Sequence, residues 1–384
     1  MKAIINGNVI KGNGVHDKVV LILGDKIIDL CDRVPEGADI IDAKGLYVSP
    51  GFIDIHIHGY KGFDMMKNTY ESLMSMSNDL LATGVTGFVA TTMTDTPERI
   101  REVIYEAKSA SLNTKGADLL GIHLEGPFIS DEYKGAHRGE YILNPSVKSF
   151  RDICDGNENF VKIVTLAPEL VGAAELIEYL KISGIVPSMG HTAASYNEGK
   201  ESILRGIKSC THMFNAMRGF LHREPGVLGA VMDSDIAAEC IADGIHVHEA
   251  ALRILIKQKG IDKVILVTDA MMGAGLEDGE YTLGGQRVYV KQGEARLKNG
   301  LLAGSVLAMD KAVRNMAKFC HLDIAKAVSL ATINPARILG LKYRGIIDKG
   351  YSSDILIFDE NINIHKVIKG ETIKWSYMGK NVFI

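Results

Sequence analysis

An alternation of polar and apolar residues before Gly59 constrains this chain more than any other feature. The six residues Ile53-Asp54-Ile55-His56-Ile57-His58 alternate strictly. Because successive side chains of a strand point to opposite faces, His56 and His58 share one face. Two strand residues in this relation lie about 7 Å apart, so both rings can reach one metal ion. Taken alone, the pattern fits equally well a half-buried edge strand whose histidines bind nothing.

Strand-like apolar runs alternate with helical patterns between residues 50 and 345. Eight such runs occur, at residues 51–58, 87–91, 119–125, 161–167, 185–191, 208–212, 237–242 and 264–269. Thr96 before Pro97 and Ser195 with Glu198 are typical helix starts. Eight strands, each followed by a helix or a long loop, predict an α/β fold of the (β/α)8 TIM-barrel class rather than an open doubly wound sheet.

Both ends of the chain predict strands instead. Short alternating runs at 2–5, 19–23 and 26–30, and again at 354–358, 365–368 and 371–377, are separated by glycine-containing turns. We expect small antiparallel sheets that combine into one β-sandwich domain. The predicted organisation is a first sandwich part at 1–49, a barrel at 50–345 and a second sandwich part at 346–384.

Composition narrows the class of protein. The 384 residues are 46% hydrophobic, and the formal net charge is -4, from 43 basic and 47 acidic residues without a run of like charge. These values predict a core of considerable size and neither a nucleic-acid nor a membrane partner. The first residues lack the apolar centre of a signal peptide, and the five cysteines are scattered without a C-x-x-C pair. We therefore expect a cytoplasmic protein with reduced thiols and no thiolate zinc site.

The predicted barrel strands end in side chains that can bind metals or transfer protons. These residues are His56, His58, Glu125, His191, His212 and Asp269. Each alone has a structural explanation, such as a turn cap or a buried hydrogen bond. Together, at the carboxyl ends of barrel strands, they predict a site for zinc, iron(II), cobalt or manganese. The two oxygens of Glu125 allow it to bridge two ions.

Two long connections follow the third and the eighth predicted strand. Residues 126–159 are expected to form a polar loop, and residues 280–304 a β-hairpin that turns at Lys298-Asn299-Gly300. Loops after barrel strands build active sites, so both are candidate walls for a substrate.

Several motifs together resemble a known family. They are Pro-Gly-Phe-Ile-Asp-x-His-x-His at 50–58, His-Leu-Glu-Gly-Pro-Phe at 123–128, Gly-Ala-His at 135–137, Gly-His-Thr at 190–192, Thr-His-x-Phe-Asn-Ala-Met at 211–217, Arg-Glu-Pro-Gly at 223–226, Ala-Asp-Gly-Ile-His at 242–246 and Val-Thr-Asp-Ala at 267–270. This set is similar to the amidohydrolase superfamily of metal-dependent barrel hydrolases, and within it to the N-acetylglucosamine-6-phosphate deacetylase family.

The resemblance implies roles for individual residues. Glu125, His191 and His212 would hold a core metal, and His56 and His58 a second ion beside Glu125. Asp269 would be the general base and acid, and His137 would assist at the acetamide carbonyl. Substrate contacts are implied for Ala136, His137, Asn215, Ala216, Arg223, His246, Leu302, Ala303 and Gly304. His246 and Arg223 would meet the phosphate, with Arg223 reaching in from a neighbouring subunit; without the resemblance, Arg223 fits a surface charge.

The resemblance further implies a homodimer that acts on a small sugar phosphate, with one or two divalent ions in each subunit. The expected reaction releases acetate from N-acetylglucosamine 6-phosphate. Alternatives are N-acetylgalactosamine 6-phosphate or another N-acyl compound as the substrate, and a barrel that has lost catalysis and serves as a binding module.

Overall fold

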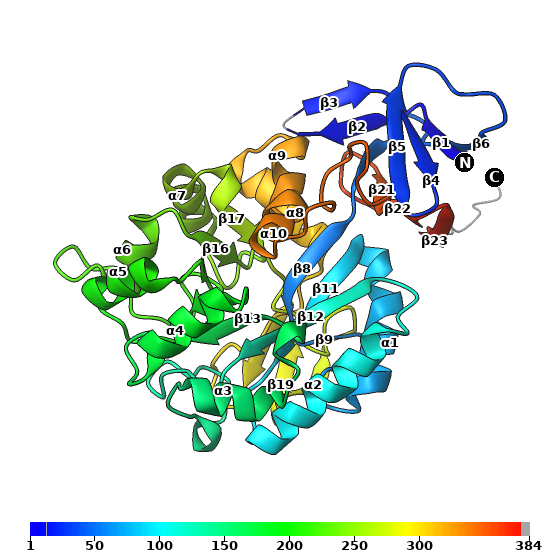
Figure 1. Cartoon of the computed structure of the whole chain (residues 1–384). Helices are drawn as coiled ribbons and strands as arrows, with labels where there is room; N and C mark the ends of the chain where they lie inside the picture. Colours follow the sequence, from blue (N-terminus) through cyan, green and yellow to red (C-terminus); the bar gives the residue numbers. More distant parts are fainter. Residues whose placement is uncertain (13, 378–384) are drawn as a thin grey trace.

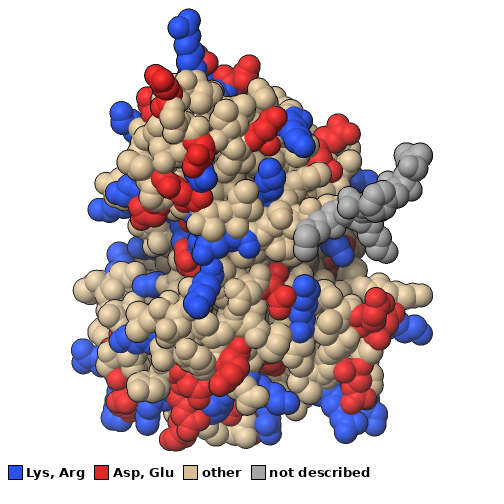
Figure 2. All heavy atoms as spheres, turned by 90° about the vertical axis from the view of Figure 1, so that its right-hand side faces the viewer, with Lys and Arg blue, Asp and Glu red and all other residues tan. Residues whose placement is uncertain are grey.

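A parallel β-barrel and a β-sandwich make up the computed structural model, which describes residues 1–12 and 14–377. Figure 1 shows the sandwich, formed by the blue and red ends of the chain, beside the barrel. Basic and acidic side chains are interspersed over the face in Figure 2, as expected from the small net charge. Among the described residues, no helix combines the length and apolarity needed to cross a membrane.

All eight predicted barrel strands are present, and they pair in parallel in the order β17-β16-β15-β14-β13-β12-β11-β8. Their bounds are Phe52–Ile57 (β8), Val85–Thr92 (β11), Asp118–Glu125 (β12), Val161–Leu166 (β13), Val186–Met189 (β14), Ser209–Cys210 (β15), Ala237–Cys240 (β16) and Val264–Leu266 (β17). The predicted TIM-barrel class is confirmed.

Strand β8 lies between β11 and the segment that follows β17. A parallel bridge joins Ile57 to Ala270, and the Ala270 carbonyl accepts the His58 amide at 2.9 Å. All six residues of β8 are consequently buried. The alternative that residues 53–58 form a half-buried edge strand is therefore wrong. One face of β8 points into the barrel interior, and the other packs against the surrounding helices.

Helices cover the outside of the barrel (Figure 1). The predicted caps occur: Thr96 Oγ1 accepts the Arg99 amide at 3.2 Å, and Ser195 and Glu198 form a capping box. The α-helices are Thr69–Asp79 (α1), Pro97–Ser111 (α2), Val147–Cys154 (α3), Ala173–Ile182 (α4), Tyr196–Arg205 (α5), Gly226–Met232 (α6), Glu249–Lys259 (α7), Met309–Cys320 (α8), Ile324–Ser329 (α9) and Ile333–Ile338 (α10). Short 3-10 helices are Leu80–Thr83 (η1), Gly139–Tyr141 (η2), Glu158–Phe160 (η3) and Ile261–Lys263 (η4).

Both chain ends build the sandwich, as predicted. One sheet has the order β5 (Lys26–Cys31), β4 (Val19–Leu23), β1 (Lys2–Ile5), β6 (Asp39–Asp42). The other has the order β23 (Thr372–Ser376), β22 (Ile364–Lys369), β21 (Ile355–Phe358), β7 (Tyr47–Pro50), β2 (Asn8–Lys11), β3 (Gly14–Asp17). A separate apolar cluster that includes Ile22, Val48 and Ile357 fills this domain.

The strand direction within the sandwich differs from the prediction. The pairs β1–β6 and β2–β7 are parallel, so the sheets are mixed rather than antiparallel. The two strands of each pair are joined by a long connection. Such a connection allows parallel pairing, whereas a tight hairpin allows only antiparallel pairing. The domain limits at 49/50 and 345/346 stay a prediction, and residues 378–384 of the predicted second part lie outside the described residues.

Both long connections contain more structure than expected. The predicted polar loop at 126–159 includes helix α3, which begins at the Ser146 cap and buries Phe150, Ile153 and Cys154 on one side. The predicted hairpin is a three-stranded antiparallel sheet of β18 (Gly279–Leu283), β19 (Gln286–Lys291) and β20 (Glu294–Leu297). Two short strands, β9 (Gly59–Tyr60) and β10 (Phe63–Asp64), follow β8.

An ion network connects the sandwich to the amino ends of the barrel strands. Arg344 Nη1 lies 2.8 Å from Asp118 at the start of β12, and its Nη2 lies 2.8 Å from Asp354. Lys369 of β22 also binds Asp118, at 2.6 Å. The side chains of Arg344 and Asp354 are 13% and 8% exposed, so their contact is shielded from water, whereas Asp118 is 44% exposed and its contacts are shielded only in part. The sandwich thus supports the end of the barrel opposite the candidate site.

Candidate metal centre and active site

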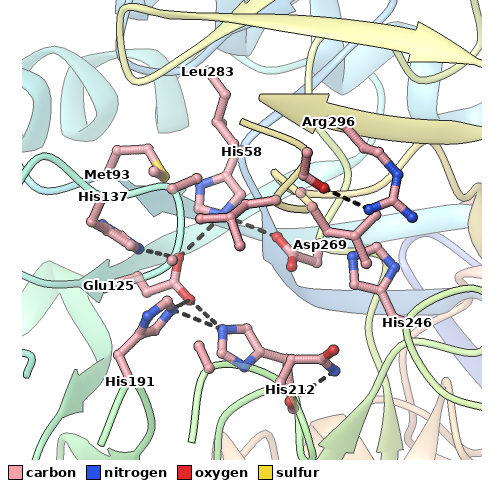
Figure 3. A pocket seen from close by; sticks show the side chains of 18 residues that line it. His58, Met93, Glu125, His137, His191, His212, His246, Asp269, Leu283 and Arg296 are labelled. Carbon is pink, nitrogen blue, oxygen red and sulfur yellow. Dashed lines mark hydrogen bonds and ion pairs between the residues drawn. The ribbon is translucent and has the colours of Figure 1, made fainter. Parts of the chain in front are cut away.

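A cavity of about 400 Å³ opens at the carboxyl ends of the barrel strands (Figure 3). Its lining residues are His58, Met93, Glu125, Gly135, Ala136, His137, His191, His212, Asn215, Ala216, His246, Asp269, Leu283, Arg296, Gly300, Leu301, Leu302 and Gly304. The two connections that were predicted as substrate walls supply residues 135–137 and 283–304 of this set. Parallel strands bring their ends together at one rim, which explains why residues far apart in sequence meet here.

Five imidazole rings surround one buried carboxylate, that of Glu125 at the end of β12. The distances from Nε2 to the nearest Glu125 oxygen are 2.9 Å for His212, 3.2 Å for His58, 3.3 Å for His56, 3.3 Å for His191 and 3.4 Å for His137. Glu125 Oε1 faces His56, His191 and His212, whereas Oε2 faces His58 and His137. The two oxygens of the Glu125 carboxylate are thus placed to bridge two metal positions.

This arrangement fits a divalent metal. Glu125 forms one group with His56 and His58 and another with His191 and His212, and in each group the donor atoms lie within 4.8 Å of one another. His56 Nε2 is buried, and although Glu125 Oε1 lies 3.3 Å away, the nitrogen makes no hydrogen bond among the described residues, so its lone pair is available to a metal. Imidazole nitrogen with carboxylate oxygen is the donor set of first-row divalent ions.

Outer contacts orient three of these rings. Nδ1 of His58 lies 3.0 Å from the Thr91 carbonyl, and Nδ1 of His191 lies 2.8 Å from the Tyr133 carbonyl. Because a carbonyl oxygen can only accept, each Nδ1 donates and each Nε2 is left for the metal. His56 differs, since its Nδ1 lies 3.1 Å from a carboxylate oxygen of Glu239.

Asp269 lies beside the first group. Its Oδ1 is 3.1 Å from His58 Nε2 and 3.6 Å from His56 Nε2. Burial alone would raise the pKa of Asp269, but when the His56 and His58 rings are protonated their charges outweigh burial and lower the pKa to about 2. The carboxylate is therefore ionised and can accept a proton.

The backbone is unusual at the ends of these strands. His191, His212 and Asp269 have φ values of 47°, 28° and 49°, in the left-handed region that residues other than glycine rarely occupy. Such conformations concentrate at functional sites, where the surrounding structure holds them. They turn the chain sharply after each strand, and the side chain then points across the barrel mouth.

Comparison with known proteins agrees with this geometry. The model of the amidohydrolase family matches residues 47–382. The chain belongs to the amidohydrolase family. It is 36% identical to the N-acetylglucosamine-6-phosphate deacetylase of Lysinibacillus sphaericus over 97% of both chains, and 32% identical to the N-acetylgalactosamine-6-phosphate deacetylase of Escherichia coli O157:H7 over 93% of this chain and 95% of that one. A solved structure that is similar to this chain is a mutant N-acetyl-D-glucosamine-6-phosphate deacetylase from Mycobacterium smegmatis in complex with N-acetyl-D-glucosamine-6-phosphate. It superimposes with a TM-score of 0.92 at 30% identity, over 98% of this chain and 99% of that one.

His137 of this amidohydrolase is held as a neutral ring. The Thr94 amide donates to its Nδ1 at 3.1 Å, and burial lowers the pKa of His137 to about 4. With Nδ1 accepting, the proton of the neutral ring sits on Nε2, which faces the cavity floor near Glu125. The ring can therefore donate a hydrogen bond to a carbonyl.

His246 lies on another wall of the amidohydrolase cavity and is fixed by Asp243. Nδ1 is 2.6 Å from Asp243 Oδ2, while Asp243 Oδ1 accepts the amides of residues 245 and 246. Burial would lower the pKa of His246, but the hydrogen bond and charge of Asp243 raise it above its ordinary value. The ring therefore favours the cationic form.

Three of the predicted site residues do not line this cavity, namely Arg223, Ala303 and His56. Arg223 is exposed, and its Nη1 contacts His222 Nε2 at 2.7 Å. Ala303 is buried between its lining neighbours Leu302 and Gly304. His56 contacts Glu125 through Nε2 at 3.3 Å, and every other predicted residue lines the cavity.

Sequence analysis of the amidohydrolase missed Glu239 and Arg296. Glu239 is a lone acidic residue inside an apolar barrel strand, which is a signal for a buried polar contact. Arg296 belongs to the segment that was predicted only as a wall. It contributes a permanent positive charge to the cavity lining.

Proposed function

We propose that this amidohydrolase removes the acetyl group from N-acetylglucosamine 6-phosphate and releases glucosamine 6-phosphate and acetate. The observation that carries the proposal is the convergence of four histidines on Glu125, with Asp269 beside His58, at a cavity of about 400 Å³. The names of relatives that match nearly the whole chain supply the substrate class.

We assign the metal ligands accordingly. Glu125, His191 and His212 hold a core ion, and His56 and His58 with Glu125 hold a second ion. Zinc, iron(II), cobalt and manganese all suit these donors. When bound, such ions supply Lewis-acid activation of a water and of the scissile carbonyl.

The remaining steps belong to side chains. Asp269 accepts the proton of the attacking water and later returns it to the amine nitrogen of the leaving sugar. His137 donates from Nε2 to the acetamide carbonyl oxygen as negative charge develops there. Ala136, Asn215 and Ala216 line the adjacent space, together with Leu302 and Gly304.

The phosphate is proposed to meet His246, whose Asp243 contact favours the cationic ring. We infer a homodimer in which Arg223 enters the partner's site. Phe220 and Leu221, 55% and 65% exposed, lie on the same surface segment as Arg223. Exposed apolar residues beside a charged one are typical of an interface. We place the enzyme in the cytoplasm, because its five cysteines are all unpaired, as in reducing compartments.

An assay of acetate release tests the function. Protein loaded separately with zinc, iron(II), cobalt or manganese is given N-acetylglucosamine 6-phosphate, N-acetylgalactosamine 6-phosphate and N-acetylglucosamine at equal concentrations. We expect the highest kcat/KM with the first. Faster turnover of the galactosamine compound would shift the assignment to the alternative substrate, and no turnover of any of the three would contradict deacetylation of these sugars.

A further inference from the structure

We infer that Arg296 binds the substrate phosphate from within its own subunit and thereby sets the preference for phosphorylated sugars. The inference rests on the proposed function and adds a binding residue to it. It starts from the charge of the cavity. Among the described residues that line it, Arg296 is the one lysine or arginine, whereas Glu125 and Asp269 are anionic.

A phosphate that enters this cavity is stabilised by the cations that line it. His246 is one, but it carries a charge only while its ring is protonated. Arginine remains charged at any physiological pH, and its planar guanidinium can donate two parallel hydrogen bonds to phosphate. Figure 3 shows Arg296 and His246 on the same side of the cavity, away from His137 and His191. The two cations therefore lie on the side of the cavity opposite His137 and His191 (Figure 3).

Contacts around Arg296 hold the guanidinium in a defined orientation. Nε donates to Glu294 Oε2 at 2.7 Å, and Nη1 donates to the Gly300 carbonyl at 2.7 Å. Nη2 has no partner among the described residues, so its donors are available to a ligand. A side chain that is already fixed loses less entropy on binding than a free one.

The backbone at Arg296 is equally well held. Strand β20 pairs with β19 through Arg296 and Tyr289, and an isolated bridge joins Arg296 to Leu302. The side chain is 40% exposed, which places it at the mouth of the cavity rather than on its floor. This position suits the phosphate of a sugar whose acetamide lies at Glu125 and Asp269.

The test compares Arg296→Gln with the wild type on N-acetylglucosamine 6-phosphate and on N-acetylglucosamine. A lost charged hydrogen bond should lower the ratio of the two kcat/KM values roughly 10- to 100-fold, mainly through KM for the phosphorylated sugar. Inhibition by inorganic phosphate should weaken in parallel. Lys298→Gln removes a charge from the turn that follows β20, outside the cavity, and is the matched control, with an unchanged ratio.

Arg296→Lys keeps the charge without the planar fork and should recover part of the ratio. An unchanged ratio in Arg296→Gln, or an equal loss on both sugars that lysine does not recover, would overturn the inference. Failure of the proposed function is a separate result, because it would appear as a wild-type enzyme without activity on the phosphorylated sugar.

Discussion

The carboxylate of Glu239 lies 3.1 Å from Nδ1 of His56, and both side chains are completely buried. His58 and His191 instead donate to neutral backbone carbonyls. A carboxylate behind a histidine fixes the ring and makes the opposite nitrogen a stronger ligand. Glu239 also accepts the His212 amide at 3.3 Å, so it connects both proposed metal positions.

Because Glu239 contacts the ring of His56 but only the backbone amide of His212, Glu239→Gln should weaken binding of the second ion more than that of the core ion. Loss of an outer-shell partner of this kind typically lowers metal affinity about 10- to 100-fold. The protein is titrated with a competing chelator, and its metal content is measured by mass spectrometry. The variant should lose one equivalent of metal at a lower chelator concentration than the wild type and retain the other. Glu178→Gln, at an exposed pair with Arg205, is the control. Equal affinity in the variant and the wild type would contradict the role of Glu239.

Replacing His56 by Gln and His58 by Asn should separate one ion from two. The double variant keeps Glu125, His191 and His212, so one equivalent of metal should remain, with reduced but measurable activity. Glu125→Gln should have a larger effect because Glu125 belongs to both groups. Metal analysis after dialysis checks this, and complete loss of metal from the double variant would refute a separate core position.

Asp269→Asn should abolish proton transfer and leave metal binding intact. The expected loss in kcat is about 10²- to 10⁴-fold, the usual contribution of a general acid and base. Acetate release and metal content are measured on the same sample. Near-normal turnover with metal retained would remove Asp269 from the mechanism.

Mixing Arg223→Ala with Asp269→Asn tests the shared site. If Arg223 acts on the partner's phosphate, mixed dimers contain one site with an intact arginine and an intact base, so activity should return after subunit exchange. Arg223→Ala alone should lower kcat/KM for the phosphorylated sugar about 10- to 150-fold. Differently tagged subunits verify that subunits have exchanged. If they have exchanged and activity does not return, Arg223 lies outside the partner's site.

Arg344→Leu should destabilise the junction between barrel and sandwich. In the variant only Lys369 still contacts Asp118 and Asp354. Because Asp354 is buried whereas Asp118 is 44% exposed, we expect the loss of about 1–3 kcal/mol of unfolding free energy that is typical of one buried group deprived of its partner. Lys148→Met, in an exposed pair with Asp152, should change stability by less than about 1 kcal/mol. Urea unfolding followed by circular dichroism compares the two, and similar small effects would show that the Arg344 contacts add little.

Local sequence patterns were sufficient for the barrel strands and for the residues at their ends. Periodicity and glycine positions depend on neighbouring residues only, and parallel strands necessarily gather their carboxyl ends at one rim. This is why His56, His58, Glu125, His191, His212 and Asp269 could be selected before any distance was known. The same reasoning failed for α3, whose eight residues offer too short an apolar stripe to stand out from a polar loop.

Tertiary structure alone decided which atoms meet. Glu239 and His56 are 183 positions apart, so no local pattern could pair them, and the choice of Nδ1 as donor depends on that contact. Likewise, in the sequence Arg296 is one of several basic residues in a segment predicted to form antiparallel strands. Only the packing of β18 to β20 over the barrel mouth brings it to the cavity. The sequence by itself determined the elements and the chemical types at their ends, because these follow from local periodicity and chain direction. The tertiary structure determined orientation, burial and charge balance, because they depend on contacts between residues remote in the chain.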